Sequence, residues 1–311
     1  MERKTQGGLN GGEDKGKVMK VLLIDIDSKI PNLALKKIEK YHLDKGDDVI
    51  WNNEPMASVC DKTYVSCIFS RNKHKTNNFI NSEIGGSGYD LKKTLPPEID
   101  MVRPRINIGF TTRGCIRKCQ FCIVPIKEGL IRVEGDIYDI WDGKSKNIVL
   151  LDNNILALFE HFKLICEQIK KEKLKVDFNQ GLDCRLLNEE NVVLLKSISH
   201  IEYRFAFDDI KLKPQVENTI KLLKKYEINR CNWYVLVGFN STLKEDLERL
   251  NFLRDNKQNA YVQRYNFSTD RKYIPLARWV NQHHIFHGMT WEQFINRKEN
   301  IKYKAEYTNA N

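Results

Sequence analysis

The sequence predicts an α/β protein with two successive parallel sheets and a short helical C-terminus. Short apolar runs typical of buried strands alternate with amphipathic stretches typical of helices, first over 18–95 and again over 105–270. The first stretch predicts a small open, Rossmann-like sheet. The second has six βα repeats, which suit a parallel barrel or an open three-quarter barrel. Residues 96–104 begin with a proline pair, Pro96-Pro97, and are expected to form an extended linker.

Composition places the chain among globular proteins. It has 41% hydrophobic and 30% charged residues, and no apolar run approaches the roughly 20 residues of a membrane span. Residues 1–17 are polar and lack the apolar core of a signal peptide, so we expect a flexible tail. Eight cysteines without an export signal favour a reducing compartment, hence a cytoplasmic location without a membrane partner.

The formal net charge of +10 suggests a polyanionic partner such as RNA. Lysine greatly outnumbers arginine, and asparagine and isoleucine are abundant, which is also typical of a biased coding composition. Lysine-rich stretches alternate with acids and apolar residues, as on an ordinary solvated helix face. RNA therefore stays an open substrate class rather than a conclusion.

In the first domain, the patterning predicts strands and helices in βαβ order. The expected strands are 18–25, 48–51, 62–69 and a strand end at 82–88, and the expected helices are 32–45 and 73–81. The turn Gly85–Gly88 should lie at the carboxyl ends of the strands, where glycines let the backbone approach a ligand.

In the second domain, the expected strands are 106–110, 147–152, 175–180, 201–207, 233–237 and 260–265, and the expected helices are 155–172, 189–198, 214–226 and 243–257. Asn188 and Ser241-Thr242 have the composition of helix starts. Residues 271–311 predict one or two helices. There, His283, His284 and His287 are spaced like metal ligands, although a polar helix end is the preferred interpretation.

Three cysteines, Cys115, Cys119 and Cys122, are spaced C-x3-C-x2-C, with Phe121 before the last. Thiolates this close can converge on one metal centre. A structural zinc site needs four protein ligands, so three thiolates fit better a 4Fe–4S cluster that leaves one iron open. A zinc knuckle remains the alternative.

This motif resembles the signature of the radical S-adenosylmethionine (SAM) superfamily. The resemblance implies a partial (β/α)6 barrel over 105–270, with Cys115, Cys119 and Cys122 as cluster ligands and SAM chelated by the open iron. Phe121 would lie near the adenine. It also implies reductive cleavage of SAM to a 5′-deoxyadenosyl radical and a one-electron donor such as flavodoxin or ferredoxin.

Further candidates lie at the carboxyl ends of the strands, where parallel barrels carry their sites. Asp152 and Asn154 follow the second strand and could accept from the amino group of SAM. For Asn153 or Asn154, a helix cap is the competing interpretation.

Gln180 could reach the ribose or carboxylate of SAM, and Arg185 could pair with the carboxylate. Arg204 and Asp208 are candidates on the fourth strand, although an Arg–Asp pair can simply brace a barrel. Gly238 belongs to a segment that resembles the one lying against the adenine in the superfamily.

Residues 18–95 resemble the cobalamin-binding-like domain that precedes many radical SAM cores. The histidine that ligates cobalt in some cobalamin proteins is missing from Asp25-Ile26-Asp27-Ser28, so bound cobalamin stays an open alternative. The motif also resembles that of radical methylthiotransferases, but only Cys60 and Cys67 precede it, which disfavours a second cluster.

Three hypotheses follow. The first is a radical SAM enzyme of unknown substrate. The second is a cobalamin-dependent methyltransferase or RNA-modifying enzyme of the same chemistry. The third, of another class, is a non-catalytic zinc or nucleic-acid-binding module.

Overall fold

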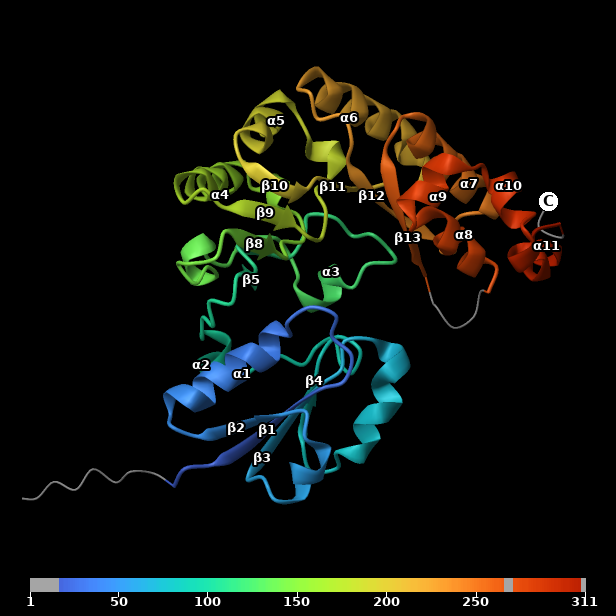
Figure 1. Cartoon of the computed structure of the whole chain (residues 1–311). Coiled ribbons are helices and arrows are strands. Elements are labelled where there is room, and N and C mark those ends of the chain that lie inside the picture. Colours follow the sequence, from blue (N-terminus) through green and yellow to red (C-terminus); the bar gives the residue numbers. More distant parts are fainter. Residues whose placement is uncertain (1–16, 266–270, 309–311) are drawn as a thin grey trace, which may run out of the picture. The chain divides into compact units, whose positions relative to one another are not determined.

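The computed structural model describes residues 17–265 and 271–308. It shows a mixed α/β protein with parallel sheets and a helical C-terminal part, as the sequence predicts (Figure 1). The chain divides into two compact units, Met1–Val102 and Arg103–Asn311. The expected flexible tail lies outside the described residues except for Lys17. Within the described ranges, no helix has the length and apolar composition that a membrane span needs.

The first unit contains a parallel sheet in the order β2-β1-β3-β4. Its elements are β1 (Lys20–Asp25), α1 (Leu33–Asp44), β2 (Asp48–Trp51), η1 (Glu54–Ser58), β3 (Lys62–Ser66), η2 (Ser70–Asn78), β4 (Glu83–Gly85) and α2 (Pro97–Asp100). Strand β1 is buried on both faces, because Val21 and Leu23 pack on the α1 side while Leu22 and Ile24 pack on the other. This explains its unbroken apolar run.

Two elements of this unit differ from the prediction. The helix expected at 73–81 is the 3-10 helix η2, which begins at Ser70 and buries only Thr76. The linker expected to be extended contains α2, whose Ile99 joins the core beneath α1. The Lys37 ammonium also donates to the Asp100 carboxylate at 2.6 Å. Pro97 at the start of α2 suits a first helical turn, so the proline pair begins a helix instead of preventing one.

The glycine turn after β4 lies against the backbone that follows β3. A Cβ on Gly86, whose φ is +98°, would lie 2.3 Å from the Cys67 carbonyl oxygen. A Cβ on Gly88 would lie 2.4 Å from the Phe69 carbonyl carbon. The glycines therefore allow two backbone segments of this unit to touch, and the approach of a ligand to this turn stays a prediction.

Replacing Gly86 by Ala is expected to destabilise the first unit by about 3 kcal/mol, because a strained φ is combined with a backbone clash. Gly46→Ala is the matched control. Gly46 has a φ of +83° but nothing within 4 Å of its ideal Cβ, so only strain of about 1 kcal/mol is expected. Hydrogen-exchange mass spectrometry of β3 and β4 measures the loss of stability in both variants. An equal loss of protection in the two variants would contradict the additional cost that we assign to the backbone clash at Gly86.

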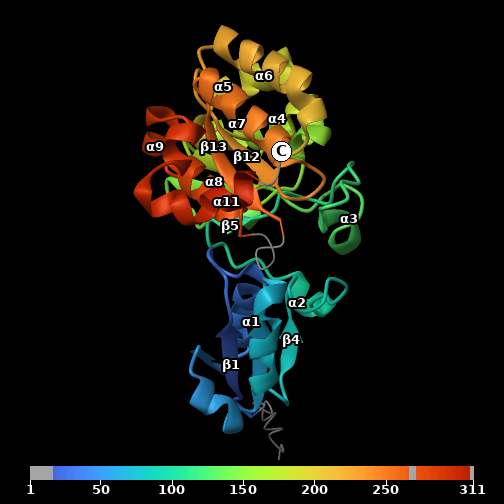
Figure 2. The same ribbon diagram turned by 90° about the vertical axis from the view of Figure 1, so that its right-hand side faces the viewer.

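The second unit contains two parallel sheets, β10-β9-β8-β5 and β11-β12-β13, joined by a bridge between Leu182 and Phe205. Its elements before the C-terminal helices are β5 (Ile108–Gly109), β6 (Thr112–Arg113), α3 (Val124–Lys127), β7 (Arg132–Val133), η3 (Ile137–Asp139), β8 (Asn147–Leu150), η4 (Ile155–Ala157), α4 (Phe159–Lys171), β9 (Lys175–Phe178), η5 (Cys184–Leu186), α5 (Glu189–Lys196), β10 (Ser199–Glu202), β11 (Arg204–Ala206), η6 (Ile210–Leu212), α6 (Lys213–Lys225), β12 (Asn232–Val237), α7 (Leu243–Asp255) and β13 (Asn259–Arg264). Strands of successive repeats neighbour one another, and α4 to α7 lie along the outside of the strands (Figures 1 and 2). Among the described residues, no pairing of β13 with β5 closes a barrel.

The strand predicted at 201–207 is broken at Tyr203. The part before it, β10, pairs with β9 through an irregular register, and the part after it, β11, pairs with β12. The Tyr203 ring stacks on His200 with centroids 4.1 Å apart, and its carbonyl accepts from the Asn232 N–H at 2.8 Å. The break thus transfers the chain from one sheet to the other. The strand predicted at 106–110 is shorter too, reduced to β5.

The predicted helix starts are confirmed. Asn188 caps α5 by accepting from the Asn191 N–H, and Thr242 forms a capping box with Glu245 at the start of α7. Helix α4 starts at Phe159, after the 3-10 turn η4, rather than at 155.

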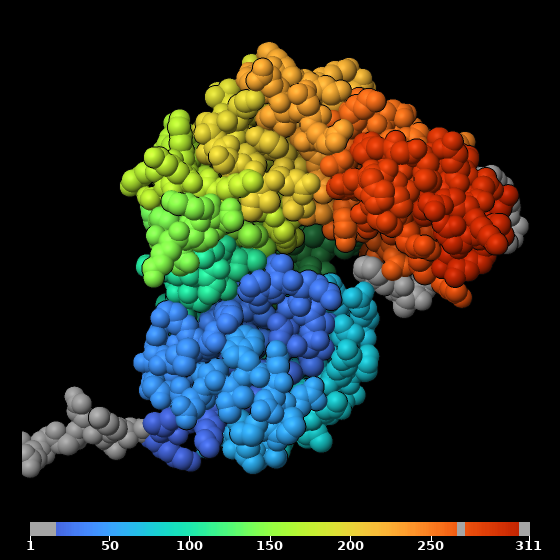
Figure 3. All heavy atoms as spheres, in the orientation of Figure 1, coloured from blue at the N-terminus to red at the C-terminus, as the bar shows by residue number. Residues whose placement is uncertain are grey.

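The C-terminal part has more helices than the one or two predicted. They are α8 (Tyr273–Val280), α9 (His283–Gly288), α10 (Trp291–Ile295), η7 (Lys298–Asn300) and α11 (Ile301–Thr308). Side chains of α8 to α10 join the core of the second unit, and these helices form a continuous part of its surface, red in Figure 3. His287 bonds to the Asn259 side chain at 3.0 Å, which agrees with a polar helix end.

Candidate functional site

The segment with the three cysteines is a loop closed at its base by a short antiparallel pair, β6 with β7. A Cβ on Gly114, whose φ is +82°, would lie 2.3 Å from the Leu130 carbonyl oxygen, so only glycine fits where the two ends cross. The Cys115 N–H donates to the Gly129 carbonyl at 3.2 Å. Arg113 binds Glu128 at 2.8 Å across the same base. These contacts hold the two ends of the loop together.

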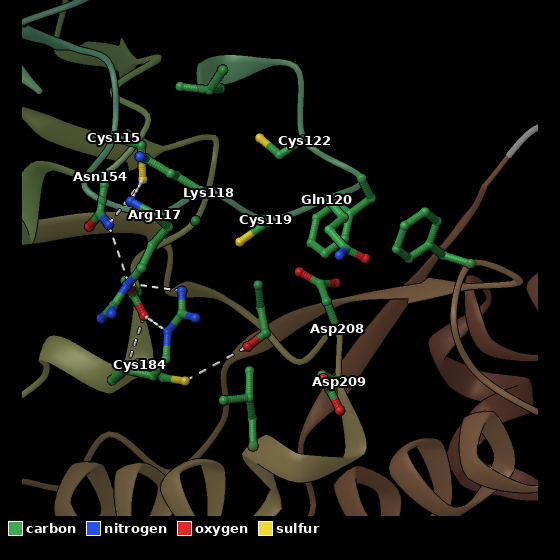
Figure 4. Close-up of a pocket in the computed structure, with 18 of the residues that line it drawn as sticks. Cys115, Arg117, Lys118, Cys119, Gln120, Cys122, Asn154, Cys184, Asp208 and Asp209 are labelled. Carbon is green, nitrogen blue, oxygen red and sulfur yellow. Dashed lines mark hydrogen bonds and ion pairs between the residues drawn. The ribbon is translucent and has the colours of Figure 1, made fainter. Parts of the chain in front are cut away.

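The loop forms one wall of a cavity of about 790 Å³. Several predicted site residues line this cavity: Cys115, Cys119, Cys122, Phe121, Asn154, Gln180, Arg185 and Asp208. They come from the loop and from the segments that follow β8, β9 and β11. Figure 4 shows the three loop cysteines in the upper part of the view, with Asp208, Asp209 and a further cysteine, Cys184, below them. The carboxyl ends of parallel strands therefore meet the cysteine loop, as expected for a site in such a fold.

Asp183 links the loop to the strand ends and is not among the site residues that the sequence predicts. Its carboxylate accepts from the guanidinium groups of Arg117 at 3.1 Å and Arg185 at 2.6 Å, and from the Asn154 amide at 3.2 Å. Burial by itself raises the pKa of Asp183, but its bonds to the two arginines outweigh burial and lower this pKa below its ordinary value. The carboxylate is thus a fixed negative charge at neutral pH. In the sequence, the only pattern that points to Asp183 is its spacing of two residues from a basic side chain, Arg185.

The sulfur of Cys115 already accepts two N–H groups. The backbone N–H of Arg117 lies 3.3 Å from Sγ and the Asn154 amide lies 3.4 Å from it. Donors of this kind orient thiolates and tune metal centres. Burial raises the pKa of Cys119, an effect that the Arg185 charge partly opposes, and burial also raises the pKa of Cys122. Deprotonation of these thiols would therefore be coupled to metal binding.

The two asparagines after β8 position the loop. The Gly114 N–H donates to the Asn153 side chain at 3.0 Å. Asn154 is 3% exposed, occupies the position before η4 without a capping bond, and directs its amide toward Cys115 and Asp183. The capping interpretation is therefore wrong for this side chain. Its carbonyl oxygen is buried without a protein partner.

Asp152 lies behind the cavity and does not line it. Its Oδ1 accepts from the hydroxyls of Thr111 at 2.8 Å and Thr112 at 2.6 Å, and from the Thr111 N–H at 3.1 Å. Burial raises the pKa of this carboxyl group above its ordinary value. In this arrangement Asp152 braces the strand that leads into the loop, and its role as a cofactor ligand stays a prediction.

Arg204 and Gly238 also lie outside the cavity lining. Arg204 pairs with Asp177 through two bonds of 2.7 and 3.2 Å and reaches the Tyr234 hydroxyl at 3.2 Å, so it braces three strands. A Cβ on Gly238 would lie 2.6 Å from the Tyr273 ring. Neighbouring Phe239 does line the cavity, with its ring 5.7 Å from Phe121 and 4.8 Å from Tyr265.

Asp208 is half-buried opposite the cysteines (Figure 4). It accepts from the Leu236 N–H at 2.9 Å. Burial raises its pKa above the ordinary value. A fourth thiol, Cys184, also lines the cavity, but burial raises its pKa to about 12, so it stays protonated.

The donor set fits an iron–sulfur cluster by type and place. The three thiols are free, face one cavity and come from one loop, and no helix or strand lies between Gly114 and Ile123. In the part of the chain that the structure describes, no three His, Cys, Asp or Glu side chains are yet close enough together to hold a metal ion. Binding would therefore require the loop to draw its thiolates together.

Replacing Asp183 by Asn is expected to destabilise the second unit by about 2 kcal/mol, because Arg117 and Arg185 lose their counter-charge. Both arginines are about one-third exposed, which keeps the loss below that of a fully buried pair. The lowered pKa means that the stabilisation exists above the ordinary value of 3.8 and is lost as the pH falls through the lower, folded value. Urea unfolding at neutral pH measures the loss. Asp209→Asn, at an exposed carboxylate lining the same cavity, should change little; an equal loss in both variants would contradict the linking role.

No protein-family model and no curated protein matches this chain.

Proposed function

We propose that this protein is a radical SAM enzyme that binds a 4Fe–4S cluster through Cys115, Cys119 and Cys122. One observation carries the proposal. The loop with the C-x3-C-x2-C spacing and the polar residues that follow β8, β9 and β11 line the same cavity. A three-thiolate site with an open position needs such a neighbouring space for a second ligand.

When bound, the cluster supplies the electron for reductive cleavage of SAM to methionine and a 5′-deoxyadenosyl radical. The protein's own residues orient the cofactor. Asn154 lines the cavity beside Cys115 and is the candidate contact for an amino group, and Arg185 offers a guanidinium to a carboxylate. Phe121 and Phe239 supply an apolar wall for a purine. Asp208 lies across from the loop cysteines (Figure 4), and we assign it to contacts with the cofactor or the substrate.

The test is anaerobic reconstitution of the full chain with iron and sulfide. We expect about four iron and four sulfide per chain, as in a 4Fe–4S cluster. Addition of dithionite and SAM should then yield 5′-deoxyadenosine, measured by liquid chromatography and mass spectrometry. The same preparation is assayed for zinc and for cobalamin, which identifies the zinc-module and cobalamin-dependent alternatives.

A protein that holds zinc in place of iron would overturn the proposal. A reconstituted cluster that never cleaves SAM under any reductant would overturn it as well. Stoichiometric cobalamin together with cleavage would retain the radical chemistry and assign the cobalamin-dependent branch, with the first unit as the place to search for the second cofactor.

A further inference from the structure

Strand β13 presents two exposed tyrosines on one face. Tyr261 and Tyr265 are 43% and 41% exposed, and Gln263 between them is exposed as well. Tyr265 continues the ladder past the end of β13, because its N–H donates to the Val237 carbonyl at 3.0 Å. Side chains alternate along a strand, so these three project from the same face, while Val262 is buried on the other. A sheet face that exposes two large rings indicates a contact surface.

A row of aromatic rings connects this face to the cavity. Phe121 and Phe239 line the cavity, and the ring centroids of Phe239 and Tyr265 are 4.8 Å apart. Farther along β13, the ring centroids of Tyr261 and Tyr234 are 6.1 Å apart. Both pairs are edge contacts, with interplanar angles of 71° and 87°, so each tyrosine of β13 keeps one ring face clear of that neighbour. A flat group can stack there.

The free edge of β13 is closed to a peptide strand. β13 ends the row β11-β12-β13 (Figure 1). At Val262 the Asn281 side chain takes both backbone groups of that edge, accepting from the N–H at 2.7 Å and donating to the carbonyl at 3.2 Å. A peptide that binds by adding a strand needs these groups. A partner of this surface is therefore held by the side chains of the face and not by the backbone of the edge.

Charge favours an anionic polymer as that partner. Of the 51 Lys and Arg residues 35 lie in 103–311, and of the 41 Asp and Glu residues 26 do, so 1–102 is left with 16 against 15. The excess positive charge thus belongs to the second unit. Asp177 and Glu202, acids of the neighbouring strands β9 and β10, are both paired with Arg204, at 2.7 and 2.9 Å. Their charge therefore opposes a bound polyanion only weakly.

We infer that Tyr261, Gln263 and Tyr265 bind bases of a single-stranded nucleic acid, which is the substrate class of the adjoining cavity. Stacking on an exposed tyrosine holds a base of any sequence. The Gln263 amide between the two rings both donates and accepts, which suits the hydrogen-bonding edge of a base. As a substrate the strand rests on the proposed function, whereas as a ligand of β13 it does not.

The first arm of the test measures binding to the full chain without added iron. A labelled single-stranded RNA of about 12 nucleotides is titrated by fluorescence anisotropy. Tyr261→Ser should weaken the Kd by at least about fivefold, the low end of what one stacked base contributes. Tyr261→Phe keeps the ring and should keep the affinity. The matched control is Tyr226→Ser, at a half-buried ring of the helix side whose hydroxyl bonds to Glu189 at 3.2 Å; it should bind as the unaltered chain does.

Two further measurements locate the strand. The same RNA carrying 4-thiouridine is photo-crosslinked to the unaltered chain, and mass spectrometry should find the adduct within residues 259–265. Gln263→Ala should reduce the differences in Kd among RNAs that each contain one kind of base, because the amide that reads base edges is gone.

The second arm uses the reconstituted protein with dithionite and SAM. The RNA should raise the formation of 5′-deoxyadenosine in the unaltered chain and in Tyr226→Ser. This increase should be lost in Tyr261→Ser at limiting RNA, because the strand is no longer held beside the cavity.

Equal affinity of Tyr261→Ser and Tyr226→Ser for the RNA would overturn the inference, as would a duplex that binds as tightly as the single strand. Binding of aromatic peptides in place of RNA, lost in Tyr261→Ser, would overturn it too. Free nucleosides that compete at the concentration of the strand would overturn the polymer as the source of the base. RNA that binds without raising SAM cleavage would overturn its role as substrate. Failure of every preparation to cleave SAM would overturn the proposed function instead, and the binding arm would still decide what β13 binds.

Discussion

Cys119→Ser is expected to lower 5′-deoxyadenosine formation by at least about 100-fold, the upper end of what changes around metal ligands already cost. Cys119 is the middle cysteine of the loop and half-exposed to the cavity. A serine hydroxyl ionises far less readily than a thiol and is a poor ligand for iron in such clusters. Two thiolates cannot replace the set of three.

The measurement combines iron content with product formation after reconstitution. Cys60→Ser is the matched control, because Cys60 is a half-buried free thiol in the other compact unit. It should retain both iron and product. Circular dichroism should show both variants folded. If Cys119→Ser keeps its iron and its activity, the assignment of the loop as a cluster site is wrong.

Arg249→Leu is expected to destabilise the second unit by about 4 kcal/mol, the range for breaking a buried ion pair. The side chains of Arg249 and Asp246 are both fully buried and 2.5 Å apart. The guanidinium also donates to the carbonyls of Phe207 at 2.5 Å and Leu236 at 2.7 Å, which adjoin the two strand ends next to Asp208. Its removal leaves a buried carboxylate without a counter-charge and these carbonyls without a donor.

Urea unfolding measures this prediction. Lys213→Leu is the control for a cation on the surface, because Lys213 pairs with Glu248 at an exposed position and should cost less than about 1 kcal/mol. In the double variant Arg249→Leu/Asp246→Leu the unpaired charge is gone, so we expect it to recover part of the lost stability. A loss below 1 kcal/mol in Arg249→Leu would show that the buried pair is not what holds these strand ends.

Several features of this protein could be predicted because their causes are local. The run Val21–Ile24 predicts a strand buried on both faces, and the structure places it at the centre of its sheet. Asn188 and Thr242 predict helix starts, since a cap bonds to the backbone a few residues onward. The cysteine spacing predicts a compact ligand set within one short segment, and this stays a prediction until a cluster is bound.

Other features depend on partners that are distant in the sequence. Glycines at 86 and 88 predict freedom to meet a ligand, yet they are required by backbone 67–70 of the same unit. Tyr203 lies in a segment whose pattern predicts one strand, but pairing with two different neighbours divides that strand. Arg204, a predicted cofactor contact, pairs with Asp177 on β9, a strand of the other sheet of its unit.

The sequence by itself determined the α/β class, the order of strands and helices, and the cysteine loop, because periodicity, caps and spacing act over a few residues. Only the tertiary structure decided which polar residues meet that loop. Asp183 lies 66 residues from Arg117 and bonds to it all the same, whereas Asp152, closer in sequence to the loop, faces away from the cavity. Which side chains share a cavity depends on how strands align and where each one ends, and no local pattern encodes that alignment.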